Sequence, residues 1–211
     1  MYFKYHNKNI FVIDDLKQWG IYNMYIHDNK FYEDEFLNYT LSLNLAGIYL
    51  DIGANIGNHS LFWGLFSKAD KIISFEPLPR FVHVLIKNLI ANKVLHKVDI
   101  YPFGLSDIQG YQNIKFFDTI TPTLVKRLDD ICLKLDSHIS LLKVDIEGME
   151  PQCLAGAINI IKKNKPIIFA EAHSNSVLDK IMSIIEPIGY QLSGKIFNAS
   201  PTYEIIANNT E

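Results

Sequence analysis

An acidic residue and a glycine-containing turn follow the first strongly apolar run of this chain, in the segment IYLDIGANIGNHS at residues 48–60. Asp51 ends the apolar run, and Gly53, Asn55 and Gly57 follow before a helical pattern begins. Glycine lets the backbone turn tightly and approach a ligand closely because it has no Cβ atom. The free N–H groups at the start of a helix can face a polar or anionic group. The stretch therefore predicts a strand, a ligand-binding turn and a helix in succession.

A second acidic residue, Glu76, ends the apolar run of KIISFEP at residues 71–77, 25 residues after Asp51. In nucleotide-binding strand–helix–strand units, an acid about 20 residues further on binds the ribose hydroxyls. The two acids together predict an adenosine cofactor at the carboxyl ends of two neighbouring strands.

The form of the turn distinguishes between two adenosine cofactors. A dinucleotide site requires G-x-G-x-x-G, whereas this turn reads G-x-x-x-G from Gly53 to Gly57, directly after Asp51. A carboxylate at this position repels a pyrophosphate but attracts the sulfonium and the α-amino group of S-adenosylmethionine. The sequence therefore predicts S-adenosylmethionine, with a nicotinamide cofactor as the alternative.

Further ionisable residues end two later apolar runs, in the segments ISLLKVD and PIIFAEAH. Side chains alternate along a strand, so Lys143 and Asp145 share one side of the first, and Glu171 and His173 share one side of the second. Lys143 is either a functional group or a lysine whose stem lies on a covered face while its amine reaches water.

A strand–helix alternation begins at Ile48 and predicts a mostly parallel sheet with helices on both faces. Residues 2–28 are read as short strands and turns, and a hairpin is expected at 109–124. The expected strands begin at Ile48 and lie at 71–76, 98–101, 139–145, 166–173, 190–197 and 203–207, and the expected helices lie at 30–45, from Asn58, at 79–94, from Glu150 and at 175–188.

Composition predicts one compact domain of 211 residues, with a lead-in segment at 1–45 and the main domain at 46–211. The lead-in is expected to cover one edge of the sheet and to help close the active site. The net charge of −3 does not indicate a nucleic-acid partner, and no apolar run approaches the about 20 residues of a transmembrane helix. Cys132 and Cys153 are predicted to be reduced, in a cytoplasmic protein. The oligomeric state is not predicted.

Five segments resemble, in order, the pattern of FkbM-type methyltransferases: DIGANIGNHS, FEPLPR, FGLSD, LLKVDIEGMEPQCLAGA and PIIFAEAH. The resemblance covers about residues 31–173, and KVDIEG is its most family-specific part. It implies a class I, S-adenosylmethionine-dependent O-methyltransferase with a Rossmann-like α/β fold. The implied sheet has seven strands in the order 3-2-1-4-5-7-6, with the last strand antiparallel. The implied acceptor is a sugar hydroxyl in a glycan, polysaccharide or glycoconjugate.

The resemblance also implies roles for individual positions. The methionine end would contact Asp51, Gly53, Asn55, Gly57, Asn58 and Ser60, the ribose would contact Glu76 with Pro77 beside it, the adenine would contact Gly104, Leu105 and Ser106, and Asp145 would lie beside the transferred methyl group.

A sugar hydroxyl is a weak nucleophile, so the site needs a base or a metal ion. The catalytic candidates are Lys143, Asp145, Glu171 and His173. His173 is the best-matched base at neutral pH, whereas Asp145 would orient the acceptor or take the proton itself. Alternatively, Asp145, Glu171 and His173 would bind magnesium or manganese.

The predicted activity is therefore O-methylation of a sugar. The alternatives are a nicotinamide-dependent oxidoreductase and a non-catalytic cofactor-binding module of a larger glycan-building enzyme.

Overall fold

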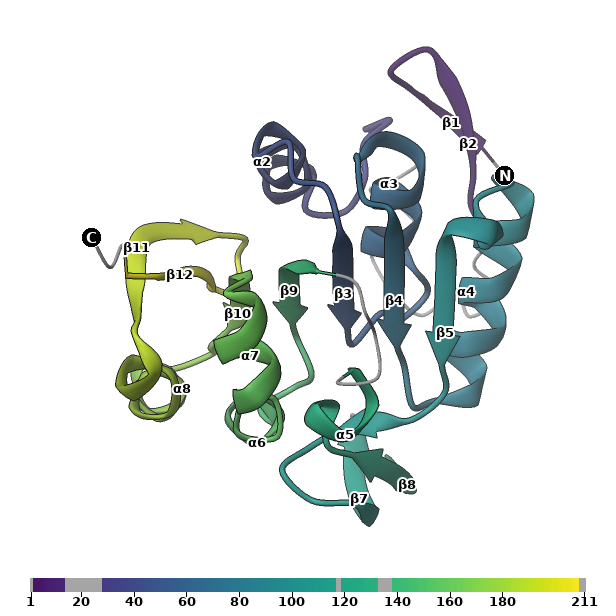
Figure 1. The fold of residues 1–211 in the computed structure, drawn as a ribbon. Helices are drawn as coiled ribbons and strands as arrows, with labels where there is room; N and C mark the ends of the chain where they lie inside the picture. Colours follow the sequence, from purple (N-terminus) through teal and green to yellow (C-terminus); the bar gives the residue numbers. More distant parts are fainter. Residues whose placement is uncertain (1, 14–27, 117–118, 133–137, 209–211) are drawn as a thin grey trace.

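Seven strands form the central sheet of the computed structural model, which describes residues 2–13, 28–116, 119–132 and 138–208 (Figure 1). The strands are β3 (Ile48–Ile52), β4 (Lys71–Phe75), β5 (Val98–Tyr101), β9 (Ile139–Val144), β10 (Ile167–Glu171), β11 (Tyr190–Phe197) and β12 (Thr202–Ala207). Their spatial order is β11-β12-β10-β9-β3-β4-β5, and β12 runs antiparallel to both of its neighbours. Counted along the chain from β3, this order is 3-2-1-4-5-7-6 when read from β5. The predicted α/β fold class is confirmed.

Helices cover both faces of this sheet (Figure 1). The helices are α2 (Asp34–Ser42), α3 (Asn58–Phe66), α4 (Pro79–Ala91), α5 (Leu128–Cys132), α6 (Glu150–Ala155), α7 (Ile158–Asn164) and α8 (Asn175–Ile185), with 3-10 turns η1 (Leu95–Lys97) and η2 (Glu186–Ile188). Leu141 and Phe169 pack with α2, α3 and α4, while Leu142 packs with α6, α7 and α8 on the opposite face. Because side chains alternate, Lys143 and Glu171 project toward the α2–α3–α4 layer.

Two smaller sheets flank the central one. Strands β6 (Gly104–Leu105), β7 (Gly110–Phe116) and β8 (Thr119–Lys126) form a three-stranded sheet, in which β7 and β8 pair antiparallel. The hairpin expected from the turn-rich segment at 109–124 is therefore confirmed. Strands β1 (Tyr2–Tyr5) and β2 (Lys8–Phe11) form a separate hairpin near the N-terminus.

The β1–β2 hairpin packs on helices, whereas the lead-in was expected at an edge of the sheet. The side chain of Asn92 bonds to both the N–H and the C=O of Phe11, directly after α4. Tyr5 contacts Phe62 and Phe66 of α3 edge-to-face. The aromatic side chains of the hairpin bury apolar surface against these helices, so the hairpin joins the α3–α4 layer. The helix α2 of the same lead-in packs on Phe169 of β10 and on Phe197 of the edge strand β11.

Several elements are shorter than the sequence predicts. The helix expected at 30–45 begins only at Asp34 and ends at Ser42, and the helix expected at 79–94 ends at Ala91. The helix expected to reach residue 188 ends at Ile185 and continues as η2. The expected strands and turns within 14–27 lie outside the described residues.

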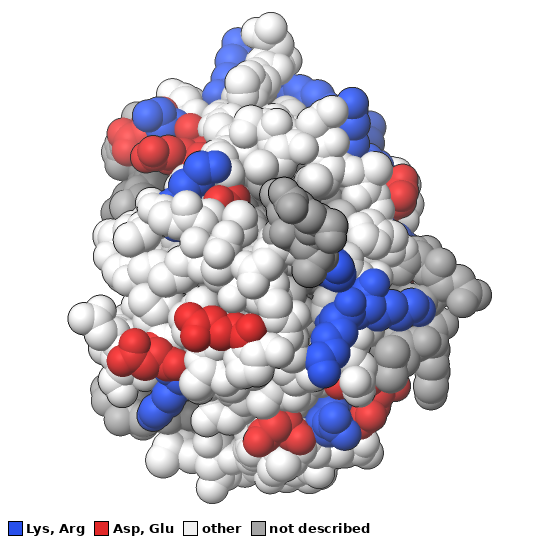
Figure 2. Space-filling view, turned by 60° about the vertical axis from the view of Figure 1, so that its left-hand side comes forward, with Lys and Arg blue, Asp and Glu red and all other residues white. Residues whose placement is uncertain are grey.

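Within the described part of the chain, no helix combines the length and apolar character needed to cross a membrane. On the face shown in Figure 2, acidic and basic side chains are interspersed, and the basic ones gather only in short groups. Cys153 is buried and unpaired, whereas the side chain of Cys132 lies outside what the structure describes.

Candidate active site

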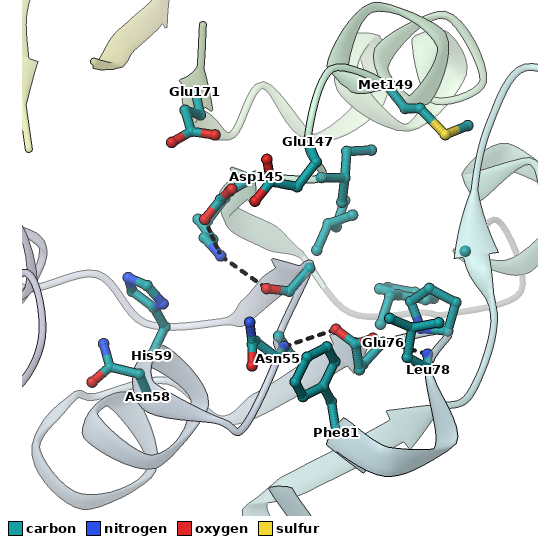
Figure 3. A pocket seen from close by; sticks show the side chains of 18 of the residues that line it. Asn55, Asn58, His59, Glu76, Leu78, Phe81, Asp145, Glu147, Met149 and Glu171 are labelled. Atoms are coloured by element: carbon teal, nitrogen blue, oxygen red, sulfur yellow. Dashed lines mark hydrogen bonds and ion pairs between the residues drawn. The ribbon is translucent and has the colours of Figure 1, made fainter. Parts of the chain in front are cut away.

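A cavity of about 510 Å³ opens at the carboxyl ends of β3, β4, β9 and β10. Figure 3 shows Glu76 and Phe81 toward one side of this cavity, and Asp145 and Glu171 toward another. This size lies within the range of about 300–1,000 Å³ that is usual for small-molecule sites. Its position at the carboxyl ends of parallel strands is where open α/β sheets bind their ligands.

Most of the predicted site residues line this cavity. Those that line it are Gly53, Asn55, Asn58, Glu76, Pro77, Gly104, Leu105, Lys143, Asp145, Glu171 and His173, whereas Asp51, Gly57, Ser60 and Ser106 do not. Ser106 is fully buried, and its hydroxyl lies 3.1 Å from Asp107 Oδ1. The structure therefore brings together residues from five separate segments of the sequence.

Glu76 has a carboxylate that is fixed by the backbone and almost fully buried. Its Oε2 accepts a hydrogen bond of 2.9 Å from the N–H of Asn55, and its Oε1 accepts one of 2.9 Å from the N–H of Leu78. Burial raises the pKa of Glu76 to about 7, although these two hydrogen bonds act in the opposite direction. Each oxygen keeps a further lone pair, so the carboxylate can accept two more hydrogen bonds from a diol.

Asp51 holds the glycine turn in place through buried contacts with Ser60 and Lys143. It is fully buried, and its Oδ2 accepts hydrogen bonds from both the N–H and the hydroxyl of Ser60. Its Oδ1 lies 3.4 Å from Lys143 Nζ. Asp51 and Ser60 thus fix the start of α3 relative to β3. Neither side chain lines the cavity, so this geometry does not support the direct ligand contacts expected of them. A carboxylate at the end of a fully covered strand is stable only when it is paired in this way.

Lys143 joins the turn to the acidic end of the cavity. Its Nζ donates a 3.1 Å hydrogen bond to the C=O of Gly53 and lies 3.3 Å from Asp145 Oδ2. Burial lowers the pKa of Lys143, but the charges of Asp145 and Asp51 outweigh burial and raise it. The ammonium therefore stays charged and holds its three partners in place.

Gly53 has no room for a side chain. An added Cβ would lie 1.8 Å from the backbone oxygen of Asp145, and the φ of Gly53 is +81°. Glycine is required here because β9 and the turn cross closely, in addition to the approach to a ligand that the sequence predicts.

Asp145 and Glu171 form a hydrogen-bonded carboxyl pair. Burial and the charge of Asp145 raise the pKa of Glu171 to about 9. Burial also acts to raise the pKa of Asp145, but Lys143 and the hydrogen bond from Glu171 lower it overall. At neutral pH, Glu171 is therefore protonated and Asp145 is ionised. Oε2 of Glu171 lies 2.9 Å from Nε2 of His173, whose side chain is 44% exposed.

The geometry does not support the divalent cation predicted at Asp145, Glu171 and His173. Among the residues that the structure describes, no group of three or more His, Cys, Asp or Glu side chains is arranged to hold a metal ion. The ammonium of Lys143 lies 3.3 Å from Asp145 Oδ2 and already neutralises a carboxylate that a cation would need.

The cavity is also lined by Tyr32, Glu33 and His59, which were not singled out from the sequence. His59 Nε2 lies 2.8 Å from Glu33 Oε2, and both side chains are at least nine-tenths buried. Asn58 Nδ2 donates a 2.8 Å hydrogen bond to the backbone oxygen of Tyr32. These pairs are 26 residues apart, so no local sequence pattern links them.

Glu150 shapes the loop between Asp145 and α6. Its Oε1 accepts hydrogen bonds of 2.9 Å from the N–H of Ile146 and 3.1 Å from the N–H of Gly148. Glu147, between them, takes a left-handed backbone conformation with φ of 56° and lines the cavity. The buried Glu150 therefore holds the loop that carries the carboxylate of Glu147 into the cavity.

The fold and the site together define an α/β domain whose cavity opens at the switch point of its sheet, between β3 and β9. Residues 51–192, more than half of the chain, match the family described as Methyltransferase FkbM domain. The chain belongs to this family, and the resemblance seen in its sequence is confirmed.

Two curated relatives of this chain are also named as methyltransferases. The chain is 30% identical over 152 residues to methyltransferase sdnD of Sordaria araneosa, covering 51% of this chain and 59% of that protein. It is 21% identical to the 31-O-demethyl-FK506 methyltransferase FkbM of Streptomyces tacrolimicus, covering 83% of this chain and 85% of that protein. The chain thus spans less than two thirds of the first of these relatives.

Solved structures show the same fold. A methyltransferase FkbM from Methylobacillus flagellatus KT has a TM-score of 0.59 at 22% identity, covering 77% of this chain and 44% of that one. A precorrin-6y C5,15-methyltransferase from Geobacter metallireducens GS-15 has a TM-score of 0.56 at 16% identity, covering 82% of this chain and 87% of that one. At these identities the likeness concerns the fold alone.

Proposed function

We propose that this chain is an S-adenosylmethionine-dependent O-methyltransferase that acts on a sugar hydroxyl of a glycan or glycoconjugate. The observation that carries the proposal is a single cavity with Glu76 in one part and Asp145, Glu171 and His173 in another. The first part suits a ribose diol, and the second suits a hydroxyl that must lose a proton. Membership of the FkbM family favours methyl transfer over the nicotinamide alternative.

The cavity residues fit S-adenosylmethionine. Glu76 would accept hydrogen bonds from the two ribose hydroxyls, and the apolar side chains of Leu78, Phe81 and Leu105 would flank the adenine. Asp145, ionised and beside the turn at Gly53, would face the positive charge of the methionine end. When bound, S-adenosylmethionine supplies an electrophilic methyl group on a sulfonium.

The acidic end provides an acceptor for the hydroxyl proton. Nε2 of His173 lies 2.9 Å from Oε2 of Glu171, so a proton on Nε2 would face this carboxyl group and leave Nδ1 with the free lone pair. In this arrangement Nδ1 takes the proton of the acceptor hydroxyl, Glu171 orients the ring, and Asp145 aligns the hydroxyl. The hydroxyl oxygen becomes a stronger nucleophile as its proton leaves.

Oxygen as the methylated atom is supported by the name of one relative, which specifies a 31-O-demethyl substrate for that protein. The alternative of a non-catalytic module is disfavoured because the acidic end retains an ionised carboxylate and a half-exposed histidine. A module that only binds the cofactor has no need for either group in its cavity.

The test is methyl transfer from S-adenosylmethionine labelled on its methyl group to a panel of soluble glycosides, with products identified by mass spectrometry. Calorimetry with S-adenosylhomocysteine measures cofactor binding separately. We expect binding and a methyl ether on at least one sugar. Absence of S-adenosylhomocysteine binding by the folded protein contradicts the cofactor assignment, and binding without any methylated sugar contradicts the acceptor assignment.

A further inference from the structure

Tyr32 and Glu33 form one wall of the cavity, although they precede α2 and lie outside the family match at 51–192. We call them the Tyr32–Glu33 wall. The wall is tied to the first two residues of α3. Asn58 donates to the backbone oxygen of Tyr32, and His59 pairs with the carboxylate of Glu33, both at 2.8 Å. The lead-in segment therefore contributes side chains directly to the site.

The backbone of this wall is held in a conformation that it would not adopt alone. Glu33 has a φ of 59°, in the left-handed region, and its C=O accepts the N–H of Leu37 in the first turn of α2. A residue other than glycine is disfavoured in this region unless its surroundings impose the conformation. Here the pair with His59 and the first turn of α2 fix it, and Tyr32 and Glu33 both line the cavity.

Burial and the acidic residues of the cavity raise the pKa of the Tyr32 hydroxyl. Burial raises the pKa of Tyr32 to about 12, and the negative charges of Glu33, Asp145 and Glu171 add to this effect. The hydroxyl therefore stays protonated and can donate a hydrogen bond at any pH near neutral. Tyr32 thus offers the cavity both an aromatic ring and a hydroxyl donor.

The described lining of the cavity is rich in acidic side chains. Five of these lining residues are acidic, namely Glu33, Glu76, Asp145, Glu147 and Glu171, and one, Lys143, is basic apart from two histidines. Glu171 is protonated at neutral pH, so the other four carry the negative charge. Lys143 is only 2% exposed, and its ammonium already contacts Asp51, Asp145 and the Gly53 oxygen. Among the lining residues that the structure describes there is no other lysine or arginine, so an anionic acceptor would meet Asp145 and Glu147 without a free cation to pair with.

We propose that the Tyr32–Glu33 wall is the acceptor-selecting surface and that it admits a sugar ring without negative charge while carboxylated sugars are rejected. The Tyr32 ring packs against the apolar C–H face of the sugar, and its hydroxyl donates to a ring substituent. The carboxylates of Asp145 and Glu147 provide the repulsion against an anion. This inference rests on the proposed function, because it names the acceptor of that reaction.

The test compares two acceptors that differ by one group, a methyl hexoside and the hexuronide with a carboxylate at the same ring position. We expect wild-type kcat/KM to favour the hexoside by at least about tenfold, because juxtaposed like charges cost more than this factor. Tyr32→Ala should raise KM for the hexoside by about tenfold while S-adenosylhomocysteine affinity stays unchanged. Tyr111→Ala, in an exposed tyrosine of β7, is the matched control and should change neither value.

Two further variants separate the parts of the wall. Tyr32→Phe should keep the ring contact and lose the hydroxyl, so its KM should lie between those of wild type and Tyr32→Ala. Glu147→Gln should narrow the preference for the hexoside by removing one repelling charge. Equal kcat/KM for both acceptors, or an unchanged KM in Tyr32→Ala, overturns the inference while leaving the proposed function intact.

Failure of the proposed function would give a different experimental result from failure of this inference. If wild type methylates neither sugar, saturation-transfer NMR with the protein loaded with S-adenosylhomocysteine reports acceptor binding directly. Binding of the hexoside but not the hexuronide, abolished by Tyr32→Ala, then supports the wall although the reaction proposal has failed. Binding of neither sugar overturns both.

Discussion

Lys143 and Asp145 lie two residues apart at the end of β9 and form an ion pair of 3.3 Å, in which the lysine side chain is 3% exposed and the aspartate 31%. The same ammonium contacts Asp51 below the turn and the backbone oxygen of Gly53. One buried cation therefore links the strand end, the glycine turn and the carboxylate that faces the cavity.

We expect Lys143→Met to destabilise the fold by about 3–5 kcal/mol, because it leaves Asp51 buried without its counter-charge. Urea denaturation followed by circular dichroism measures this free energy of unfolding. The matched control is Lys71→Met, which removes a pair with Asp99 whose side chains are 35% and 51% exposed. An exposed pair contributes about 1 kcal/mol or less. Equal effects of the two variants would show that Lys143 has no special role.

Glu76→Ala should weaken binding of S-adenosylhomocysteine by about 1.5–3 kcal/mol, the range for hydrogen bonds to a charged group. Calorimetry on the folded variant gives this difference. Glu35→Ala, in an exposed acid of α2, serves as the control and should bind like wild type. Unchanged affinity in Glu76→Ala would remove the ribose from this position.

Cofactor affinity should also depend on pH through Glu76. Because burial raises its pKa to about 7, the carboxylate gains a proton as the pH falls through 7 and becomes a weaker acceptor. We expect S-adenosylhomocysteine affinity to fall between pH 8 and pH 6 in wild type. The decrease should be smaller in Glu76→Gln, which has no titrating group there. Parallel pH profiles for the two proteins would speak against this origin.

His173→Ala should lower turnover by about 10²–10⁴, the usual contribution of a general base, with cofactor affinity nearly unchanged. Steady-state kinetics with the best acceptor of the glycoside panel measures the turnover, and calorimetry with S-adenosylhomocysteine measures the affinity. Full activity in His173→Ala would leave Asp145 as the remaining candidate base.

The raised pKa of Glu171 predicts that the folded protein becomes less stable as the pH rises. Its pKa is raised to about 9 in the folded protein, so the folded state keeps a proton that the unfolded chain loses above about pH 4.5. The stability that this group contributes therefore falls as the pH rises from 4.5 to 9. Glu171→Gln mimics the protonated form, so its Tm should decrease less than that of wild type between pH 5 and pH 9.

Glu186→Gln is the control for this comparison, since Glu186 is exposed at the end of α8. Its Tm should follow wild type across the same range. If the difference between Glu171→Gln and wild type is constant with pH, Glu171 is ionised throughout and does not share a proton with Asp145.

The sequence by itself determined the order of strands and helices and the position of the site. Continuous apolar runs that end in Asp51, Glu76, Asp145 and Glu171 predict buried parallel strands, and the carboxyl ends of such strands meet at one edge. Alternation along β9 and β10 also predicts which side chains share a face. These features depend on local periodicity, which the sequence displays directly.

The tertiary structure alone decided what each acid does once the strands are assembled. Asp51 and Glu76 look alike in sequence, but the first is fully buried against Ser60 and Lys143, whereas the second lines the cavity. The pairing of Glu33 with His59 and the proton on Glu171 likewise arise from neighbours distant in the chain. Burial and the distance between charges set such roles, and both quantities exist only after the chain has folded.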